Sequence, residues 1–141
     1  MKPERYLVDS NIVIYCATDK ELLTAEVSAI LNDTGNLIYV PSKCVEELIY
    51  LQQSERIEVK QWKSAEDIVE YIKNELLYGI KYVREEHLQR LARLPLFPEH
   101  KDPTDRIIIA QAIAEKMPIV SSDDKFNDYK RSGLKFVYNK R

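Results

Sequence analysis

The sequence predicts one α/β domain over residues 1–141, with helices on both faces of a mainly parallel sheet of about five strands. Short apolar runs alternate along the chain with longer segments that have helical spacing. The length of 141 residues is that of one ordinary domain. With 45% hydrophobic and 31% charged residues, the composition is typical of a globular protein.

Each expected strand is a short apolar run that stops at a polar residue or a proline. The strands are expected at residues 6–8, 37–40, 80–83, 119–120 and 135–138. In a sheet of this kind, ligands bind beyond the carboxyl ends of the strands. Side chains that follow a strand are therefore the first candidates for a functional site.

The helices are expected at residues 11–17, 21–32, 42–53, 64–78 and 85–94, followed by one that begins at Pro103 and is broken by Pro118. Ser42 is expected to cap the third helix, and Gly79 to end the fourth. The helix after Pro103 is apolar on all sides, which predicts that it is buried.

Several function classes are excluded by composition. No apolar run approaches the ~18 residues that a membrane span needs, and the first residues lack the apolar core of a signal peptide. We therefore expect a cytoplasmic protein with no membrane partner. Cys16 and Cys44 are expected to be small buried side chains rather than metal ligands. The net charge of −2 does not by itself indicate a nucleic-acid-binding protein.

Acidic residues occupy the positions where a functional site is expected. Asp9 directly follows the first strand, and Asp123 comes shortly after the fourth. The others stand early in helices that adjoin strands: Glu46, Glu47, Asp102 and Asp105. All of these elements can meet at one edge of a parallel sheet.

Each acid also has a local structural interpretation. Asp9 and Asp102 are suited to helix caps, and Asp105 to the third position of a capping box. Glu46 and Glu47 favour the positive end of their own helix, as Asp123 and Asp124 do after a Ser122 cap. The combination is harder to explain locally, because two like charges ~4 Å apart cost about 4 kcal/mol at an effective dielectric of 20. Acids gathered in one cleft would need a cation, and oxygen ligands suit Mg²⁺ or Mn²⁺.

Four separated segments of the chain resemble those of PIN-domain nucleases, in particular the VapC-like toxins. They are residues 7–11, 42–48, 100–106 and 120–126. The third is similar to the His-x-Asp-Pro-x-Asp-Arg signature of one toxin subgroup, and it is the most specific. Ser121 stands where threonine is usual, and Thr104 where a bulkier apolar residue is common.

The resemblance implies a role for each matching residue. Asp9, Glu47, Asp105 and Asp123 would be the catalytic, metal-binding carboxylates. Glu47 is preferred to Glu46 because it directly precedes Leu48, and Asp105 to Asp102 because it begins the Asp-Arg step. The supporting residues would be Asn11, Ser121, Asp102 and Arg106, with Asn11 and Ser121 orienting carboxylates or bound water.

The implied function is hydrolysis of RNA by metal-activated water in a three-layer PIN-like fold, with Mg²⁺ or Mn²⁺ as cofactor. The implied partners are a cognate antitoxin and a second copy of the chain. The alternatives are a non-catalytic PIN-like module that binds RNA or protein, and an RNA-processing nuclease without an antitoxin. A phosphotransfer domain fits less well, because Asn11 stands where its second acid would be.

Other residues are expected to have structural roles. His100 lies beside prolines and lacks a suitable histidine partner, so we expect it to be structural rather than a general base. Tyr15, Tyr50 and Tyr129 could stack on bases, but packing is the expected role of each.

Overall fold

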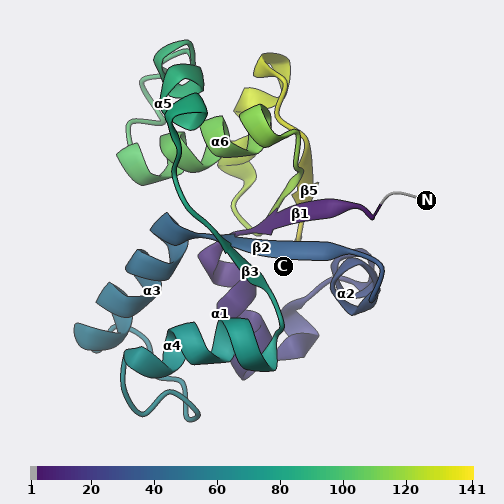
Figure 1. Ribbon diagram of the computed structural model, residues 1–141, viewed down its shortest axis with the longest axis vertical. Helices are drawn as coiled ribbons and strands as arrows, with labels where there is room; N and C mark the ends of the chain where they lie inside the picture. The colour runs from purple at the N-terminus through teal and green to yellow at the C-terminus, as the bar shows by residue number, and fades with distance from the viewer. Residues whose placement is uncertain (1–2) are drawn as a thin grey trace.

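The computed structural model describes residues 3–141, and these form a three-layer structure around one parallel sheet (Figure 1). The sheet has five strands in the order β3-β2-β1-β4-β5, and each neighbouring pair is parallel. The strands are β1 (Arg5–Val8), β2 (Leu37–Pro41), β3 (Gly79–Lys81), β4 (Ile119–Ser121) and β5 (Phe136–Tyr138). The predicted fold class is confirmed.

Helices and helical turns connect the strands. Before β3 they are α1 (Ser10–Thr18), η1 (Lys20–Leu22), α2 (Ala25–Asn32), α3 (Ser42–Gln53), α4 (Glu66–Glu70) and η2 (Tyr71–Glu75). After β3 they are α5 (Glu85–Ala92), α6 (Pro103–Glu115) and η3 (Asp124–Ser132).

The two sets of helices lie on opposite faces of the sheet. In Figure 1, α1 to α4 lie below the strands, and α5, α6 and the yellow-green helical segment η3 lie above them. This follows from right-handed crossovers, because the chain moves from β1 towards β3 and then returns past β1 to β4. The direction reverses between β1 and β4, and ligands of α/β folds bind at such a reversal.

The expected helix over residues 21–32 is divided in two. Asp19 accepts a hydrogen bond from the Glu21 backbone N–H and so begins the short 3₁₀ turn η1. Thr24 then starts α2, with its hydroxyl accepting from the Val27 N–H at 3.2 Å. Two local caps therefore prevail over the helical spacing that runs across them.

The expected helix over residues 64–78 ends earlier than predicted. Its last part is the π-helical turn η2, and Leu77 leaves the helix with φ of 60°. Gly79, predicted to end this helix, is instead the first residue of β3. There a Cβ atom would lie 2.6 Å from Tyr39 Cδ1, so close packing requires the glycine. The predicted Ser42 cap is also wrong, because Pro41 occupies the cap position and Ser42 is the first helical residue.

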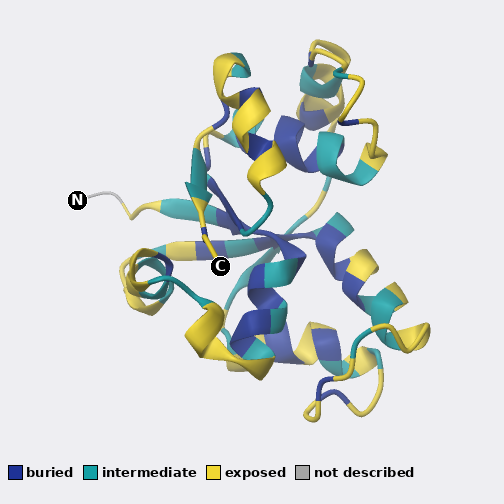
Figure 2. Ribbon diagram, turned by 180° about the vertical axis from the view of Figure 1, so that it is seen from behind, coloured by how far each residue is buried: buried dark blue, intermediate teal, exposed yellow. Residues whose placement is uncertain are grey.

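The core lies on both sides of the central strands (Figure 2). Leu7 and Val8 in β1, with Ile119 and Val120 in β4, have no exposed surface. The expected burial of α6 is confirmed for its middle part, residues 107–112, whereas both of its ends are partly exposed. Cys16 and Cys44 are buried free thiols, as expected. Within residues 3–141, the structure contains no helix of the length and apolarity that a bilayer crossing demands.

Candidate acidic site at the carboxyl ends of the strands

The structure places Asp9 at the reversal point of the sheet. Val8 of β1 pairs with Val120 of β4, and the Asp9 backbone N–H continues the ladder by donating to the Val120 carbonyl at 3.0 Å. Asp9 also caps α1, because its carboxylate accepts from the Ser10 N–H. The local interpretation of Asp9 as a helix cap is therefore correct and is compatible with a place in a site.

Four donors surround the buried Asp9 carboxylate. Oδ1 accepts from the Ser10 backbone N–H at 2.9 Å and from the Cys44 thiol at 3.5 Å. Oδ2 accepts from the Ser121 hydroxyl at 2.7 Å and from Asn11 Nδ2 at 3.4 Å. Burial raises the pKa of Asp9, while the bonds from Ser121, Ser10 and Cys44 act in the opposite direction. The carboxylate is thus fixed in one orientation.

Ser121 connects Asp9 to the loop that carries Asp123. Its hydroxyl accepts from the Asp123 backbone N–H at 3.0 Å and from Asn11 Nδ2 at 3.2 Å. The Asp123 side chain accepts from the Lys125 N–H and caps η3, so the cap is Asp123 and not Ser122. Asp124 is exposed, as expected.

Glu47 reaches the same region from α3. The Ser10 hydroxyl donates to Glu47 Oε1 at 2.5 Å. Burial and the negative charges of Asp9 and Asp102 raise the pKa of Glu47, against the effect of the Ser10 bond. The neighbouring Glu46 is exposed and pairs with Lys43 at 3.6 Å on the outer face of the helix.

The carboxyl group of Asp105 is influenced by the charges of the other acids. This residue lies in the first turn of α6, where Asp102 caps the helix by accepting from the Thr104 N–H at 2.9 Å. Burial raises the pKa of Asp105 to about 7, helped by the negative charges of Asp102, Asp9, Asp123 and Glu47. The five acids, which come from β1, α3, α6 and the end of β4, therefore share one electrostatic environment.

Arg106 does not neutralise these acids. Its guanidinium donates to the carbonyl oxygens of Pro95 at 2.7 Å and Leu94 at 3.4 Å, and so supports the loop before α6. Among residues 3–141, no lysine, arginine or histidine nitrogen lies within 4.0 Å of a carboxylate oxygen of the five acids. Within residues 3–141, no ion pair therefore offsets their mutual repulsion.

The chemistry of the donors fits a hard divalent cation. Carboxylate and hydroxyl oxygens suit Mg²⁺ or Mn²⁺ better than Zn²⁺. The set is open, because no three of these carboxylates, within the described chain, place oxygens within 4.8 Å of one another. A Mg²⁺ ion usually keeps several waters and takes one or two carboxylates, which such an open set allows.

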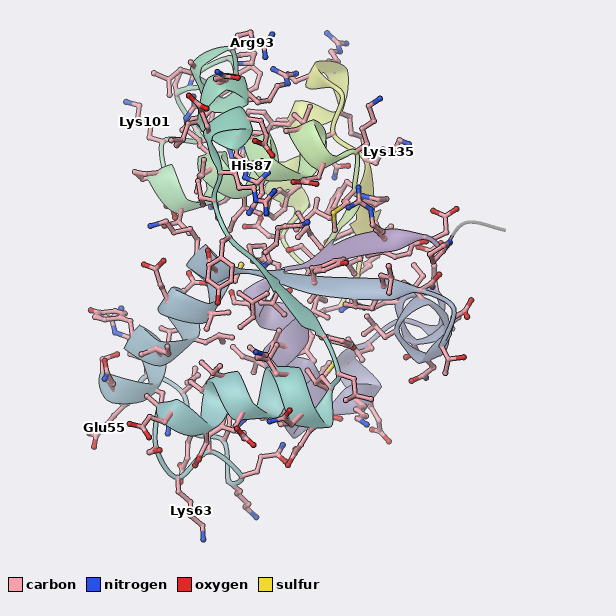
Figure 3. The ribbon with its side chains drawn as sticks, in the orientation of Figure 1. Glu55, Lys63, His87, Arg93, Lys101 and Lys135 are labelled. Atoms are coloured by element: carbon pink, nitrogen blue, oxygen red, sulfur yellow. The ribbon has the colours of Figure 1, made fainter. Side chains whose placement is uncertain are left out.

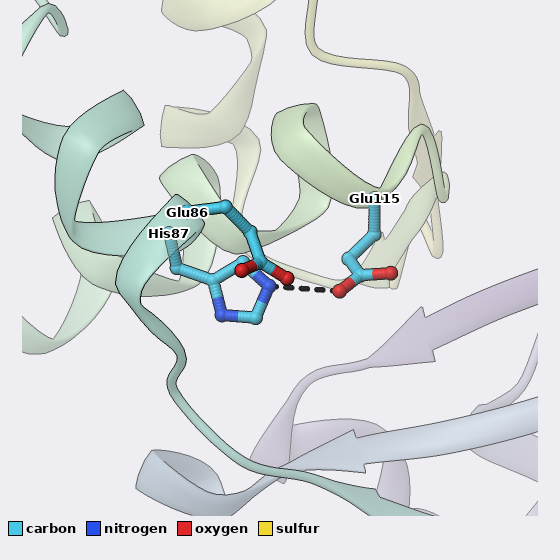
Figure 4. Close-up of side chains that lie close together, drawn as sticks. All are labelled: Glu86, His87 and Glu115. Carbon is cyan, nitrogen blue, oxygen red and sulfur yellow. Dashed lines mark hydrogen bonds and ion pairs between the residues drawn. The ribbon is translucent and has the colours of Figure 1, made fainter.

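A second cluster, formed by Glu86, His87 and Glu115, lies between α5 and α6 (Figure 4). His87 has no exposed surface; its Nδ1 accepts from the Arg84 N–H, and its Nε2 bonds to Glu115 Oε2, both at 2.8 Å. Figure 3 shows His87 directed into the molecule, whereas Lys63 and Glu55 point outward. With both ring nitrogens engaged, His87 is a structural link and not a free metal ligand.

Positive charges also hold Glu115. Burial alone would raise its pKa, but the bond from His87 and the charges of Lys81 and Arg5 together lower it. Arg5 and Lys81 each lie 3.7 Å from Glu115 Oε1. Sequence reasoning missed this link, because 28 residues separate His87 from Glu115.

His100 has a structural environment, in agreement with the expectation from the sequence. Its Nε2 bonds to Asp128, and its ring packs edge-on against Phe97 and Tyr129. These contacts join the loop before α6 to η3.

Ser10 and Cys44 contact the site and were not among the predicted residues. Ser10 stands next to Asp9 in the sequence, which was a usable signal. Cys44 precedes Glu47 by three residues and therefore lies near it on the same side of a helix. Burial and the charges of Asp9 and Glu47 raise the pKa of the Cys44 thiol well above its ordinary value, so the thiol keeps its proton and can donate.

The fold and the sequence together define the class of this protein. The sequence profile of the PIN domain family matches residues 6–132, and the chain belongs to that family. No curated protein shows significant sequence similarity to it.

Solved structures of toxin–antitoxin proteins share its fold. VapBC2 from Rickettsia felis, bound to a promoter DNA fragment, matches with a TM-score of 0.68 and 16% identity over 95% of this chain and 98% of that one. VapBC from Salmonella typhimurium, also DNA-bound, gives a TM-score of 0.66 and 14% identity over 97% and 99%. VapBC-5 from Mycobacterium tuberculosis, of the VapBC toxin–antitoxin family, gives 0.66 and 15% over 96% and 99%.

Proposed function

We propose that this chain is a metal-dependent endoribonuclease, and that it acts as the toxin of a toxin–antitoxin pair. The observation that carries the nuclease proposal is that Asp9, Glu47, Asp105 and Asp123 lie in one electrostatic environment and that none of them forms an ion pair within residues 3–141. Membership of the PIN domain family supports it. The toxin role is supported by the common fold with VapBC structures from three organisms.

The four acids would hold one or two Mg²⁺ or Mn²⁺ ions. When bound, such an ion polarises a phosphate and lowers the pKa of a bound water. The protein's own contribution is to fix the acids before the substrate arrives. Ser121 and Asn11 hold Asp9, Ser121 also holds the Asp123 backbone, and Asp102 fixes the start of the helix that carries Asp105.

The proposal is tested by comparing six variants in RNA cleavage and Mn²⁺ binding. Asp9→Asn, Glu47→Gln, Asp105→Asn and Asp123→Asn should each reduce cleavage by roughly 100-fold or more, as loss of a catalytic electrostatic group does. Glu46→Gln and Asp124→Asn are matched neighbours on exposed positions, and both should cleave like the wild type. EDTA should stop turnover, and Mg²⁺ or Mn²⁺ should restore it. Cleavage that survives both EDTA and Asp9→Asn would refute the metal-nuclease proposal.

The proposed partners are a cognate antitoxin and a second copy of the chain. Size-exclusion chromatography with light scattering, at micromolar concentration, measures the mass of the protein alone and with the small protein encoded beside it. We expect a dimer and a stable complex in which cleavage is inhibited. A monomer that does not bind the protein encoded beside it would count against the toxin role while leaving the nuclease proposal intact.

A further inference from the structure

We propose that Ser10 is a positioning residue that holds Glu47 against Asp9 and so completes the metal site. This inference rests on the proposed metal-dependent function. The observation behind it is that one residue makes a bond to each of two acids. The Ser10 backbone N–H donates to Asp9 Oδ1 at 2.9 Å, and its hydroxyl donates to Glu47 Oε1.

Ser10 is a rigid anchor for these bonds. It is the first residue of α1, directly after the end of β1, and only 9% of its surface is exposed. Its backbone is held by helical geometry, and its side chain has one rotatable bond that places the hydroxyl. A hydrogen bond from such a group costs little conformational entropy on the serine side.

Glu47 needs an anchor if it is to stay at the site. It has a long side chain on an exposed position of α3, so many of its rotamers would direct the carboxylate into solvent. The charges of Asp9 and Asp102 repel it from the site. Asp9 and Asp123 each accept a bond from a backbone N–H, whereas the Glu47 carboxylate accepts its bond from the Ser10 hydroxyl.

The Ser10 hydroxyl therefore affects metal binding by positioning Glu47 and not by stabilising the fold. Ser10→Ala removes the bond to Glu47 but keeps the backbone N–H that binds Asp9. We expect Mn²⁺ affinity to fall by roughly 10-fold, as for other residues that orient a metal ligand. Ser10→Thr keeps a hydroxyl and should restore most of the affinity. Ser10→Gly removes the hydroxyl by a second route and should resemble Ser10→Ala.

The experiment measures Mn²⁺ affinity by isothermal titration calorimetry, with circular dichroism of each variant to establish folding. Ser42→Ala is the matched control, because Ser42 is also the first residue of a helix that follows a strand, and it should bind Mn²⁺ like the wild type. A double-mutant cycle then identifies the route. In a Glu47→Ala background, Ser10→Ala should change affinity by less than about 2-fold, because the acid that it positions is gone.

Two results would overturn the inference. One is wild-type Mn²⁺ affinity in folded Ser10→Ala and Ser10→Gly. The other is an undiminished effect of Ser10→Ala in the Glu47→Ala background, which would show that Ser10 acts through the fold. If the wild-type protein binds no Mn²⁺, the proposed function and this inference both fail. If the wild type and the two Ser10 variants bind Mn²⁺ equally well, only this inference fails.

Discussion

The Ser121 hydroxyl donates a 2.7 Å hydrogen bond to Asp9 Oδ2, although the two residues are 112 positions apart in the sequence. This bond joins the end of β4 to the end of β1. The same oxygen accepts from the Asp123 N–H, so it also sets the path of the loop that carries Asp123. One hydroxyl thereby connects two of the four proposed metal-binding acids. It lies at the reversal between β1 and β4, where α/β folds bind their ligands.

Replacing Ser121 by alanine should destabilise the metal-free protein. The change removes a partner from a buried carboxylate and an acceptor from a backbone N–H, which together cost about 1–3 kcal/mol of unfolding free energy. Ser121→Thr keeps the hydroxyl and should lose less. Urea denaturation in EDTA measures both variants, and equal stability of Ser121→Ala and wild type would contradict the assigned bond.

Asp105 makes the stability of the metal-free protein depend on pH. Its pKa is raised to about 7 in the folded state, against 3.8 in the unfolded chain. Between these values the folded state binds more protons than the unfolded state, so stability falls as pH rises from about 4 to 7. The raised pKa values of Asp9 and Glu47 act in the same direction.

Asp105→Asn should remove part of the loss of stability that the metal-free protein shows as pH rises. At pH 8 the variant should be more stable than the wild type by roughly 1–2 kcal/mol, a figure reduced for the solvent exposure of the site. Near pH 4 the two should be equally stable, because wild-type Asp105 is then protonated when folded. Thermal unfolding in EDTA at several pH values measures the difference. A wild-type protein more stable than Asp105→Asn at pH 8 would contradict the repulsion.

The strands and the positions of the acids could be predicted because both depend on local sequence. Apolar runs mark buried parallel strands, and Asp9 and Asp123 follow two of them. Where local signals compete, prediction fails: Thr24 and Asp19 divide a segment that has continuous helical spacing. The π-helical turn before Leu77 has the same effect on another helix.

Contacts between distant segments could not be predicted from the sequence. The bond between Ser10 and Glu47 depends on how α1 and α3 meet at the sheet, and that arrangement has no local signature. The same holds for His87 and Glu115. Arg106 was predicted to support the site, but its guanidinium binds carbonyls of the preceding loop. The sequence could show which residues were available, and only the packing shows which of them meet.

Glu115→Gln should reduce stability without affecting the acidic site. Glutamine keeps an acceptor for His87 but loses the attraction to Lys81 and Arg5, so we expect a loss of about 1 kcal/mol at neutral pH. Because the folded-state pKa of Glu115 is lowered, this difference should disappear as pH falls through that pKa. Chemical denaturation tests it. RNA cleavage and Mn²⁺ binding should be unchanged; loss of Mn²⁺ binding here, with retention in Asp9→Asn, would place the metal at the His87 cluster instead.

Tyr50 is an exposed aromatic side chain on the helix that carries Glu47. Packing was the expected role of three tyrosines, and it holds for Tyr15 and Tyr129, which are buried. Tyr50 is 55% exposed and follows Glu47 by three residues, which places both on neighbouring positions of α3. The guanidinium of Arg56 lies 5.6 Å from the centre of its ring. An aromatic ring backed by a cation is a suitable platform for a nucleic-acid base.

Tyr50→Ala should therefore weaken the binding of single-stranded RNA by roughly 5- to 20-fold, in the range of one lost base–aromatic stack. Tyr50→Phe keeps the ring and should bind like the parent. Fluorescence anisotropy with a labelled oligonucleotide measures affinity, in an Asp9→Asn background so that the RNA stays intact. Tyr82→Ala is the control, since Tyr82 is 65% exposed but lies outside α3. Parental affinity in Tyr50→Ala, or equal losses in Tyr50→Ala and Tyr82→Ala, would show that RNA does not stack at this position.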